Sequence, residues 1–177
     1  MKRRVVIIFG SLAVAVAIGG FLLFTASLSA LDEPGRLETR VATAMKHVLV
    51  HRQASKHASP RPADLASRAA VGGMQFRGNC AGCHGFDGRT PSELGRSMYP
   101  RATDLGSAPV QQWSDEELFW IVKHGIRLTG MPGFGRNMSD DEIWTLVAYI
   151  RTLRAQPADR AEASPAATTV PRRMPRR

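Results

Sequence analysis

The chain has 177 residues, of which 44% are apolar, and its formal net charge is +9. That length suits one modest globular domain with flanking segments, and no internal repeat of the kind that builds solenoids is visible. The positive charge is unevenly placed, because residues 70–150 carry seven basic and nine acidic side chains whereas residues 151–177 carry seven basic and two acidic ones. The basic character therefore lies outside the central segment. Since no nucleic-acid-binding motif accompanies it, we expect no nucleic-acid partner.

Residues 1–31 indicate a membrane anchor. Three basic residues at positions 2–4 precede a stretch without any charge, residues 5–31. About 20 apolar residues suffice for a helix to cross a bilayer, and a basic N-terminal end favours the cytoplasmic side. We therefore expect a transmembrane helix at the bacterial inner membrane, with the rest of the chain on the periplasmic side. The alternative is a signal peptide cleaved near residues 25–29, which would leave a soluble periplasmic protein, although its apolar region usually has only about 7–15 residues.

Residues 32–69 are interpreted as an amphipathic helical linker. Apolar residues recur at helical spacing on one face, namely Leu37, Val41, Ala44, Met45 and Val48. His47 and His51 stand four residues apart in the same segment and suggest a second metal site. No carboxylate or cysteine lies near them in sequence to complete a ligand set, so a solvated histidine pair is the preferred interpretation.

The segment NCAGCHG, residues 79–85, holds the only two cysteines of the sequence. A disulfide is their usual fate after export, but redox-active C-x-x-C motifs accompany a βαβ pattern that is absent here. A structural zinc site needs four ligands, commonly two such pairs, and there is no second pair. C-x-x-C-H is also the attachment motif of c-type haem. In that interpretation Cys80 and Cys83 bond to the porphyrin and His84 gives its imidazole to the iron.

The other axial position of such an iron needs a ligand from elsewhere in the chain. Met131 lies within TGMPGFG, residues 129–135, where glycine and proline predict an irregular loop that can present a thioether at its tip. A methionine more often fills a gap in the core, but following C-x-x-C-H we interpret Met131 as the distal ligand. Met98 and Met138 are weaker candidates. His124 is the runner-up, and its default interpretation is a surface residue at a helix C-terminus.

The segment from about Ala70 to Leu153 resembles class I c-type cytochromes, especially the single-haem domains of membrane-anchored bacterial cytochromes. The resemblance rests on four motifs in order: Gly72-x-x-x-Phe76-x-x-x-Cys80, then Cys80, Cys83 and His84, then Gly130-Met131-Pro132, and finally LVAYIR at residues 146–151. It implies an all-α domain around one covalent haem c, with His84 and Met131 as iron ligands. It also implies that an aromatic residue of the last helix packs on the glycine of the first.

Local signals in the same segment agree with a helical domain. Capping boxes at residues 114–117 (SDEE) and 139–142 (SDDE) open two predicted helices, and Gly125 should end the first of them. Residues 85–112 are rich in Gly, Pro, Ser and Asp. A loop this long needs something to organise it, and we expect the haem to do so.

Further contacts to the haem are expected from this long loop. Arg96, Tyr99 and Trp113 are candidates for the haem propionates or pocket, the alternative being a solvated arginine and two core aromatics. The carbonyl of Pro91 or Pro100 is expected to accept a hydrogen bond from His84 Nδ1.

The prediction is a one-electron carrier, not an enzyme, that is tethered to the membrane and passes electrons between redox protein partners of a respiratory chain. With both axial positions held by side chains, no position is open for a substrate. The alternatives are a cytochrome subunit of a larger membrane oxidoreductase, a haem enzyme or gas sensor with a labile methionine bond, and a thiol or zinc protein without haem. The predicted organisation is an anchor (1–31), a linker (32–69), a haem domain (70–154) and a disordered basic tail (155–177).

Overall fold

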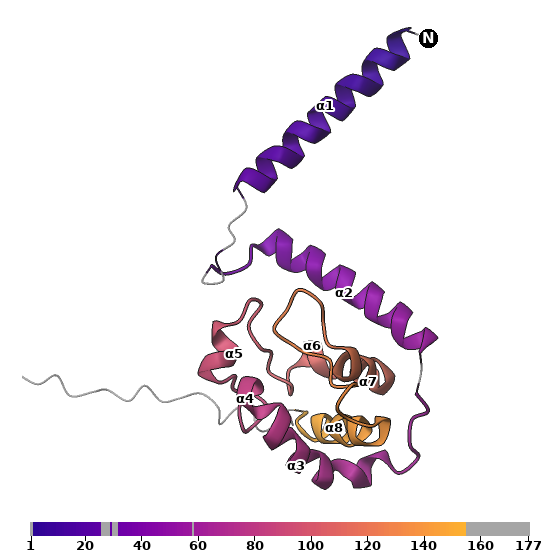
Figure 1. Cartoon of the computed structure of the whole chain (residues 1–177), viewed down its shortest axis with the longest axis vertical. Coiled ribbons are helices and arrows are strands. Elements are labelled where there is room, and N and C mark those ends of the chain that lie inside the picture. Colours follow the sequence, from indigo (N-terminus) through magenta and orange to yellow (C-terminus); the bar gives the residue numbers. More distant parts are fainter. Residues whose placement is uncertain (1, 26–28, 30–31, 58, 155–177) are drawn as a thin grey trace, which may run out of the picture. The chain divides into compact units, whose positions relative to one another are not determined.

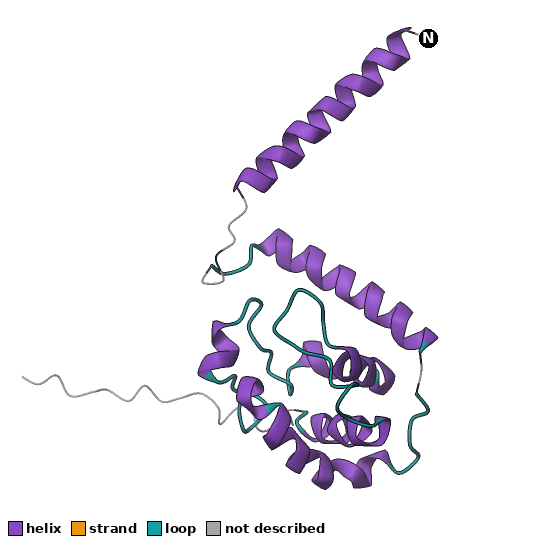
Figure 2. Ribbon diagram, viewed as in Figure 1, coloured by secondary structure: helices purple, strands orange, loops and turns teal. Residues whose placement is uncertain are grey.

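The computed structural model describes residues 2–25, 29, 32–57 and 59–154, and all regular secondary structure in these ranges is helical (Figure 2). The predicted all-α class is confirmed for this part of the chain. The chain divides into two compact units, residues 1–33 and 34–177. The predicted disordered tail, residues 155–177, lies outside the described residues.

The first unit consists of α1, Lys2–Thr25. Its described large apolar side chains, such as Ile7 and Phe9, are more than half exposed. Judged by length and hydropathy together, none of the helices in the described ranges is long and apolar enough to cross a membrane. The predicted transmembrane helix is therefore without support from the structure, and residues 26–28 and 30–31 of the predicted span lie outside the described residues.

In the second unit, all regular secondary structure among the described residues is helical (Figure 1). In chain order they are α2 (Arg36–Lys56), the 3-10 helix η1 (Leu65–Arg68), α3 (Ala69–Asn79), α4 (Ala81–His84), α5 (Glu93–Ser97), α6 (Ala108–Gln111), α7 (Asp115–His124) and α8 (Asp140–Thr152). α2 packs on α7, α7 on α8, and α8 on α3. Figure 1 accordingly shows α2 and α3 on opposite sides of this unit, with α7 and α8 between them.

The contact between α3 and α8 brings two backbones close together. A Cβ placed on Gly72 would collide with the Thr145 carbonyl oxygen, so only glycine allows this approach. The same Cβ would lie 3.0 Å from the Cβ of Tyr149, and the rings of Tyr149 and Phe76 are 4.9 Å apart between centroids. The expected packing of a last-helix aromatic on a first-helix glycine is therefore confirmed.

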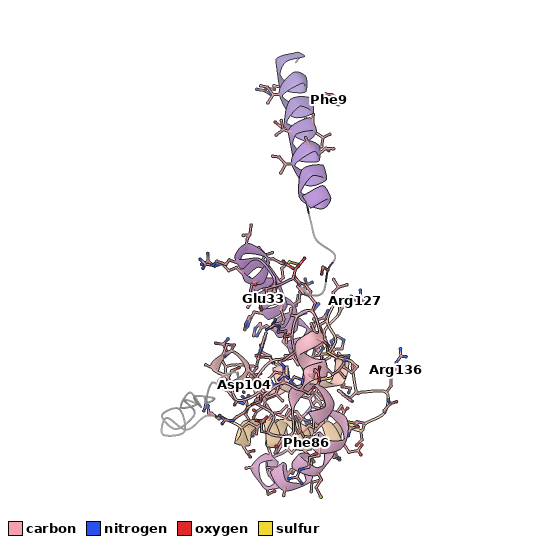
Figure 3. All side chains as sticks on the ribbon, turned by 90° about the vertical axis from the view of Figure 1, so that its left-hand side faces the viewer. Phe9, Glu33, Phe86, Asp104, Arg127 and Arg136 are labelled. Carbon is pink, nitrogen blue, oxygen red and sulfur yellow. The ribbon has the colours of Figure 1, made fainter. Side chains whose placement is uncertain are left out.

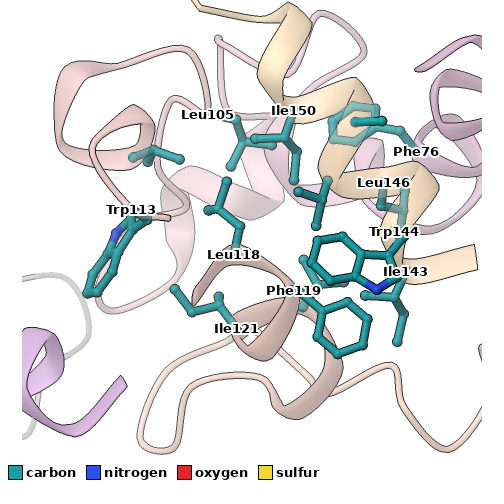
Figure 4. Packing of buried hydrophobic residues seen from close by; sticks show 14 of the residues in the cluster. Phe76, Leu105, Trp113, Leu118, Phe119, Ile121, Ile143, Trp144, Leu146 and Ile150 are labelled. Atoms are coloured by element: carbon teal, nitrogen blue, oxygen red, sulfur yellow. The ribbon is translucent and has the colours of Figure 1, made fainter. Parts of the chain in front are cut away.

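The core lies where α3, α7 and α8 meet (Figure 4). Its largest fully buried side chains are Trp144, Phe76, Phe119, Ile143, Leu146 and Val147. The rings of Phe119 and Trp144 stack with centroids 4.6 Å apart. Each such side chain contributes about 1.5–3 kcal/mol through burial, so these contacts supply the apolar free energy that a small domain needs.

Both predicted capping boxes are present. The Ser114 side chain accepts from the Glu117 backbone N–H at 3.1 Å, and that of Ser139 accepts from the Glu142 backbone N–H at 3.3 Å. Gly125, with φ of +69°, follows α7 as predicted. The long helices begin and end where local sequence chemistry indicates.

The long segment 85–112 is organised by the polypeptide itself, through α5, α6 and hydrogen bonds to the core helices. Gln111, a buried polar side chain, donates from Nε2 to the carbonyls of Leu105 (2.7 Å) and Ile150 (2.9 Å). Arg89 donates from Nη2 to the Leu153 carbonyl at 2.5 Å. The expectation that a haem must order this segment is thus incomplete, because these bonds tie it to α8 and to the residue that follows it.

Candidate functional site

The C-x-x-C-H motif lies on the single turn of α4. The Cys80 carbonyl accepts from the backbone N–H of Cys83 (3.1 Å) and of His84 (2.9 Å). Gly85 ends the turn with φ of +77°, a conformation that suits glycine. Residues three apart on a helical turn share a face, so the two cysteines lie on the same side of α4, and both are free thiols of intermediate exposure.

The Cys80 side chain is partly buried. Burial, with a smaller contribution from the neighbouring Cys83, raises the pKa of the Cys80 thiol to about 11. A structural zinc site needs four ligands, and in the part of the chain that the structure describes no group of three or more His, Cys, Asp or Glu side chains is placed to hold a metal ion. The structure therefore disfavours the zinc interpretation of this motif.

His84 is held by the backbone of a distant residue. Its Nδ1 lies 3.0 Å from the carbonyl oxygen of Thr103. Because a carbonyl can only accept, Nδ1 carries the proton and donates, which leaves the lone pair of Nε2 available for a metal. The acceptor is neither Pro91 nor Pro100, so that expectation is wrong; the Pro91 carbonyl instead accepts from Arg96 Nη1 at 2.7 Å.

Helix α5 packs directly on the attachment turn. Ser92, the N-cap of α5, donates from its hydroxyl to the Gly82 carbonyl (2.6 Å) and from its backbone N–H to the Cys83 carbonyl (3.1 Å). A Cβ on Gly95 would collide with the Cys83 carbonyl oxygen. The position of α5 relative to Cys83 is therefore fixed by backbone contacts.

Met131 is held in the loop between α7 and α8. Its carbonyl accepts from the Ile126 N–H at 3.2 Å, and its own N–H donates to Thr129 Oγ1 at 3.1 Å. Further along, the Phe134 N–H donates to the Val122 carbonyl at 3.1 Å. The Met131 side chain is half-buried against the core. The loop is irregular, as its glycines and prolines predict, yet it is fastened to the end of α7.

The same loop presents its charges to solvent. Arg127 and Arg136 are both exposed, and Figure 3 shows Arg136 pointing away from the body of the domain. Met131 thus packs against the core, whereas the two arginines of the same loop are in solvent.

Met98 connects the attachment side to the Met131 loop. A Cβ on Gly130 would lie 2.5 Å from the Met98 sulfur, so the thioether of Met98 occupies the space beside Gly130. Met98 directly follows α5, which rests on Cys83, and the chain continues to Thr103, which accepts from His84. The segment 92–103 therefore makes two contacts: Thr103 binds His84, and Met98 contacts Gly130, the residue before Met131.

The three residues expected at the haem propionates have other partners in the structure. Arg96 donates to Pro91, and the Tyr99 hydroxyl donates to the Glu38 carboxylate of α2. Trp113 is 6% exposed and stacks on His47, with ring centroids 4.0 Å apart. Their role toward the haem stays a prediction. Sequence reasoning had no signal for the His47 contact, because the two residues are far apart in the chain.

The histidine pair of α2 does not form a metal site. His51 Nδ1 lies 3.0 Å from Glu117 Oε1, while His47 stacks on Trp113. Among the described residues, no group of three or more His, Cys, Asp or Glu side chains is placed to hold a metal ion. His124 stacks on Trp120, with centroids 4.8 Å apart, which gives the runner-up ligand a structural role at the end of α7.

Comparison with known families identifies this arrangement. The family model of subunit III of cbb3-type cytochrome c oxidase matches residues 67–150. Residues 67–150 form a class I c-type cytochrome domain. The cytochrome domain includes α3 to α8 almost completely, with the attachment motif and Met131 inside the match.

Two solved structures are similar to this chain. The KustC0563 c-type cytochrome is 27% identical with a TM-score of 0.43, and the match covers 48% of this chain and 98% of that one. Cytochrome cL from the marine methylotrophic bacterium Methylophaga aminisulfidivorans MPT is 18% identical with a TM-score of 0.44, and the match covers 77% of each chain. No curated protein matches the chain.

The cytochrome domain carries one covalent haem c and is an electron-transfer protein. The residues on α4 fit that group: two free thiols share one face of a turn, and the adjacent His84 is held in the tautomer that leaves Nε2 able to bind iron. As c-type cytochrome domains are usually exported, the family match also agrees with a periplasmic location.

Proposed function

We propose that the protein is a one-electron carrier in which Cys80 and Cys83 would hold haem c, and His84 and Met131 would bind its iron. The observation that carries the proposal is the His84–Thr103 hydrogen bond, which prepares Nε2 for iron. Haem c supplies an iron that alternates between the ferric and ferrous states by one electron. A methionine ligand raises the reduction potential relative to a second histidine.

The chain's own residues then set what the site can do. Thr103 fixes the orientation and tautomer of His84. The hydrogen bonds at Ile126 and Thr129 fix the backbone of Met131, so its thioether is presented by a fastened loop and not by a free one. With both positions taken by side chains, neither oxygen nor a substrate has a place to bind, which leaves electron exchange with redox protein partners as the function.

We further propose that residues 5–31 tether the carrier to the periplasmic face of the inner membrane. The support is in the sequence, since 27 uncharged residues follow three basic ones. An alkaline carbonate wash of membranes from the native host tests this. A tethered chain stays in the pellet with its N-terminus intact by mass spectrometry. Recovery of a shortened chain in the soluble fraction would contradict the tether and support signal cleavage.

A second candidate function is a non-catalytic cytochrome subunit of a larger membrane oxidoreductase. The family model that matches residues 67–150 describes such a subunit of an oxidase, and this favours the assignment. Electrophoresis of gently solubilised membranes under native conditions, followed by a haem stain, distinguishes the two functions. A free carrier migrates as a small species, whereas a subunit migrates with a large complex.

The experiment that tests the axial ligands is absorption spectroscopy of the oxidised, detergent-solubilised full chain. Ferric haem with a sulfur ligand shows a weak charge-transfer band in the far red. We expect this band in the wild type and its loss in Met131→Leu, a change that keeps the size of the side chain and removes the sulfur.

Met138→Leu is the matched control, because Met138 is also a half-buried loop methionine packed against the core. The far-red band of this variant should be unchanged. Loss of the band in Met98→Leu with retention in Met131→Leu would move the distal ligand to Met98. A haem spectrum without the band in the wild type would overturn the closed site and favour an open iron, as in a haem enzyme or gas sensor.

A further inference from the structure

Helix α2 has apolar side chains on two different faces. Val50 and Ala54, both 3% exposed, are buried against the domain. Five large apolar residues form a second face that is about half exposed or more in the described structure: Leu37 (76% exposed), Val41 (49%), Met45 (56%), Val48 (66%) and Leu49 (50%). We call these five residues the α2 stripe.

The α2 stripe lies apart from most of the α2 side chains that contact the cytochrome domain, although Glu38, on the side of Met45 and Leu49, is bonded to the Tyr99 hydroxyl. His47 stacks on Trp113, and His51 contacts Glu117 at 3.0 Å. Positions 37, 41, 45 and 48 follow one another at steps of four, four and three, which keeps them on one side of an α-helix. That side is opposite Val50 and Ala54 on a helix of 3.6 residues per turn. The stripe is thus a solvent-exposed apolar surface of α2 and not a poorly packed part of the core.

The charge of α2 indicates what the α2 stripe faces. The helix carries five basic residues, Arg36, Arg40, Lys46, Arg52 and Lys56, against one acidic residue, Glu38. Glu38 is already engaged by the Tyr99 hydroxyl. A second copy of the same helix would bring like charges together, which disfavours a homodimer through this face. Arg52 and Lys56 lie on the same side of α2 as the stripe, and an apolar face with basic neighbours is the pattern of helices that lie in the interface of an anionic bilayer.

The place of α2 in the chain agrees with this surface. Ten residues separate the end of α1 from the start of α2, and α1 contains residues 5–25 of the uncharged stretch of the proposed tether. We propose that the α2 stripe lies on the surface of an anionic membrane, with its apolar side chains among the lipid head groups and acyl chains. This inference rests on the proposed membrane tether. It adds that the cytochrome domain is held by two contacts and so has a preferred orientation on the membrane.

Site-directed spin labelling of the full-length holoprotein tests this proposal. Cys80 and Cys83 are consumed by the haem, so a nitroxide can be placed on Val48→Cys in the stripe and on Gln53→Cys, an exposed α2 position outside it. The protein is reconstituted into vesicles made of equal amounts of phosphatidylcholine and phosphatidylglycerol. We expect the label at position 48 to become more accessible to oxygen and to lose most of its accessibility to a water-soluble nickel chelate. The label at position 53 should stay accessible to the chelate.

The same shift should be weaker in vesicles of phosphatidylcholine alone and in Arg52→Glu/Lys56→Glu, because the anionic attraction is absent. A label at position 48 that stays as accessible to the nickel chelate as the label at 53 would overturn the proposal. Immobilisation of that label without a gain in oxygen accessibility would also overturn it, in favour of a protein partner. The carbonate wash and the far-red band, measured on the same samples, report separately whether the tether or the haem ligation fails.

Discussion

The α3–α8 contact and the segment 92–103 use glycine for the same purpose but are stabilised differently. At the first, Gly72 lets two helices touch within a continuous apolar core. At the second, Gly95 lets α5 approach the Cys83 carbonyl in a largely exposed region held by backbone hydrogen bonds. The helix contact holds the core of the domain together, whereas the segment contacts His84 and the neighbour of Met131, the two proposed iron ligands. Substitutions in the two regions should therefore differ in what they damage.

The largest effect is expected for Gly72→Ala. Its new methyl group would collide with the Thr145 carbonyl, which is backbone and cannot move aside cheaply. We expect a loss of about 3 kcal/mol in the free energy of unfolding, as for an overpacked core. Chemical denaturation followed by circular dichroism measures it. Gly78→Ala is the matched control, since a Cβ at this α3 position meets nothing within 4 Å, and alanine there should be neutral or stabilising. Equal stability of the two variants would contradict the close approach.

A smaller effect is expected for Asp115→Asn, at a point where several segments meet. Asp115 accepts from Arg61 Nε and from Arg151 Nε, both at 2.6 Å. Burial raises the pKa of Asp115, but the hydrogen bonds from the two arginines outweigh it, and the pKa lies below its ordinary value. We expect the variant to lose about 2 kcal/mol at pH 7.

The lowered pKa of Asp115 determines how the stability difference between wild type and Asp115→Asn depends on pH. A carboxyl whose pKa is lowered on folding stabilises the fold above its unfolded pKa, and this contribution is lost as the pH falls through the folded pKa. The gap between wild type and Asp115→Asn should thus be constant above about pH 5 and shrink below about pH 4. Asp141→Asn, where the carboxylate is 84% exposed beside Arg68, serves as control and should cost less than about 1 kcal/mol. A gap that does not change in acid would show that the ion pairs are not its cause.

The smallest effect on folding, and the most specific one on the site, is expected for Gly130→Ala. The added methyl group meets the Met98 thioether, a flexible side chain that can shift. The free energy of unfolding should fall by no more than about 1 kcal/mol, while the far-red band should disappear at a lower temperature than the helical circular dichroism signal. Restoration of the band by the double variant Gly130→Ala/Met98→Ala would establish the contact as the cause. Unchanged thermal behaviour of the band would show that Met98 does not position the loop.

The sequence predicted those parts of the molecule that depend on local chemistry. The capping boxes at Ser114 and Ser139, the end of α7 at Gly125 and the C-x-x-C-H turn each involve residues within a few positions of one another. The packing of Tyr149 on Gly72 is a long-range contact, and it was predicted only because the motif order resembles a known family.

What the sequence did not reveal depends on tertiary contacts between ordinary residues. His84 is held by the backbone carbonyl of Thr103. Because every residue type has such a carbonyl, the sequence gives no sign of which residue accepts this hydrogen bond. The apolar periodicity of α2 indicated a helix correctly, but Val50 and Ala54 pack on the domain and the more regular stripe does not. Periodicity reports that a helix has a face, and it does not report which partner covers that face.

The segment 92–103 has a consequence for how this loop tolerates changes in length. Exposed loops usually accept insertions at little cost. Here Met98 must reach Gly130 while Thr103, five positions later, must reach His84. One added residue between them puts one of these contacts out of register. Among homologues we therefore expect the number of residues between these two positions to be kept.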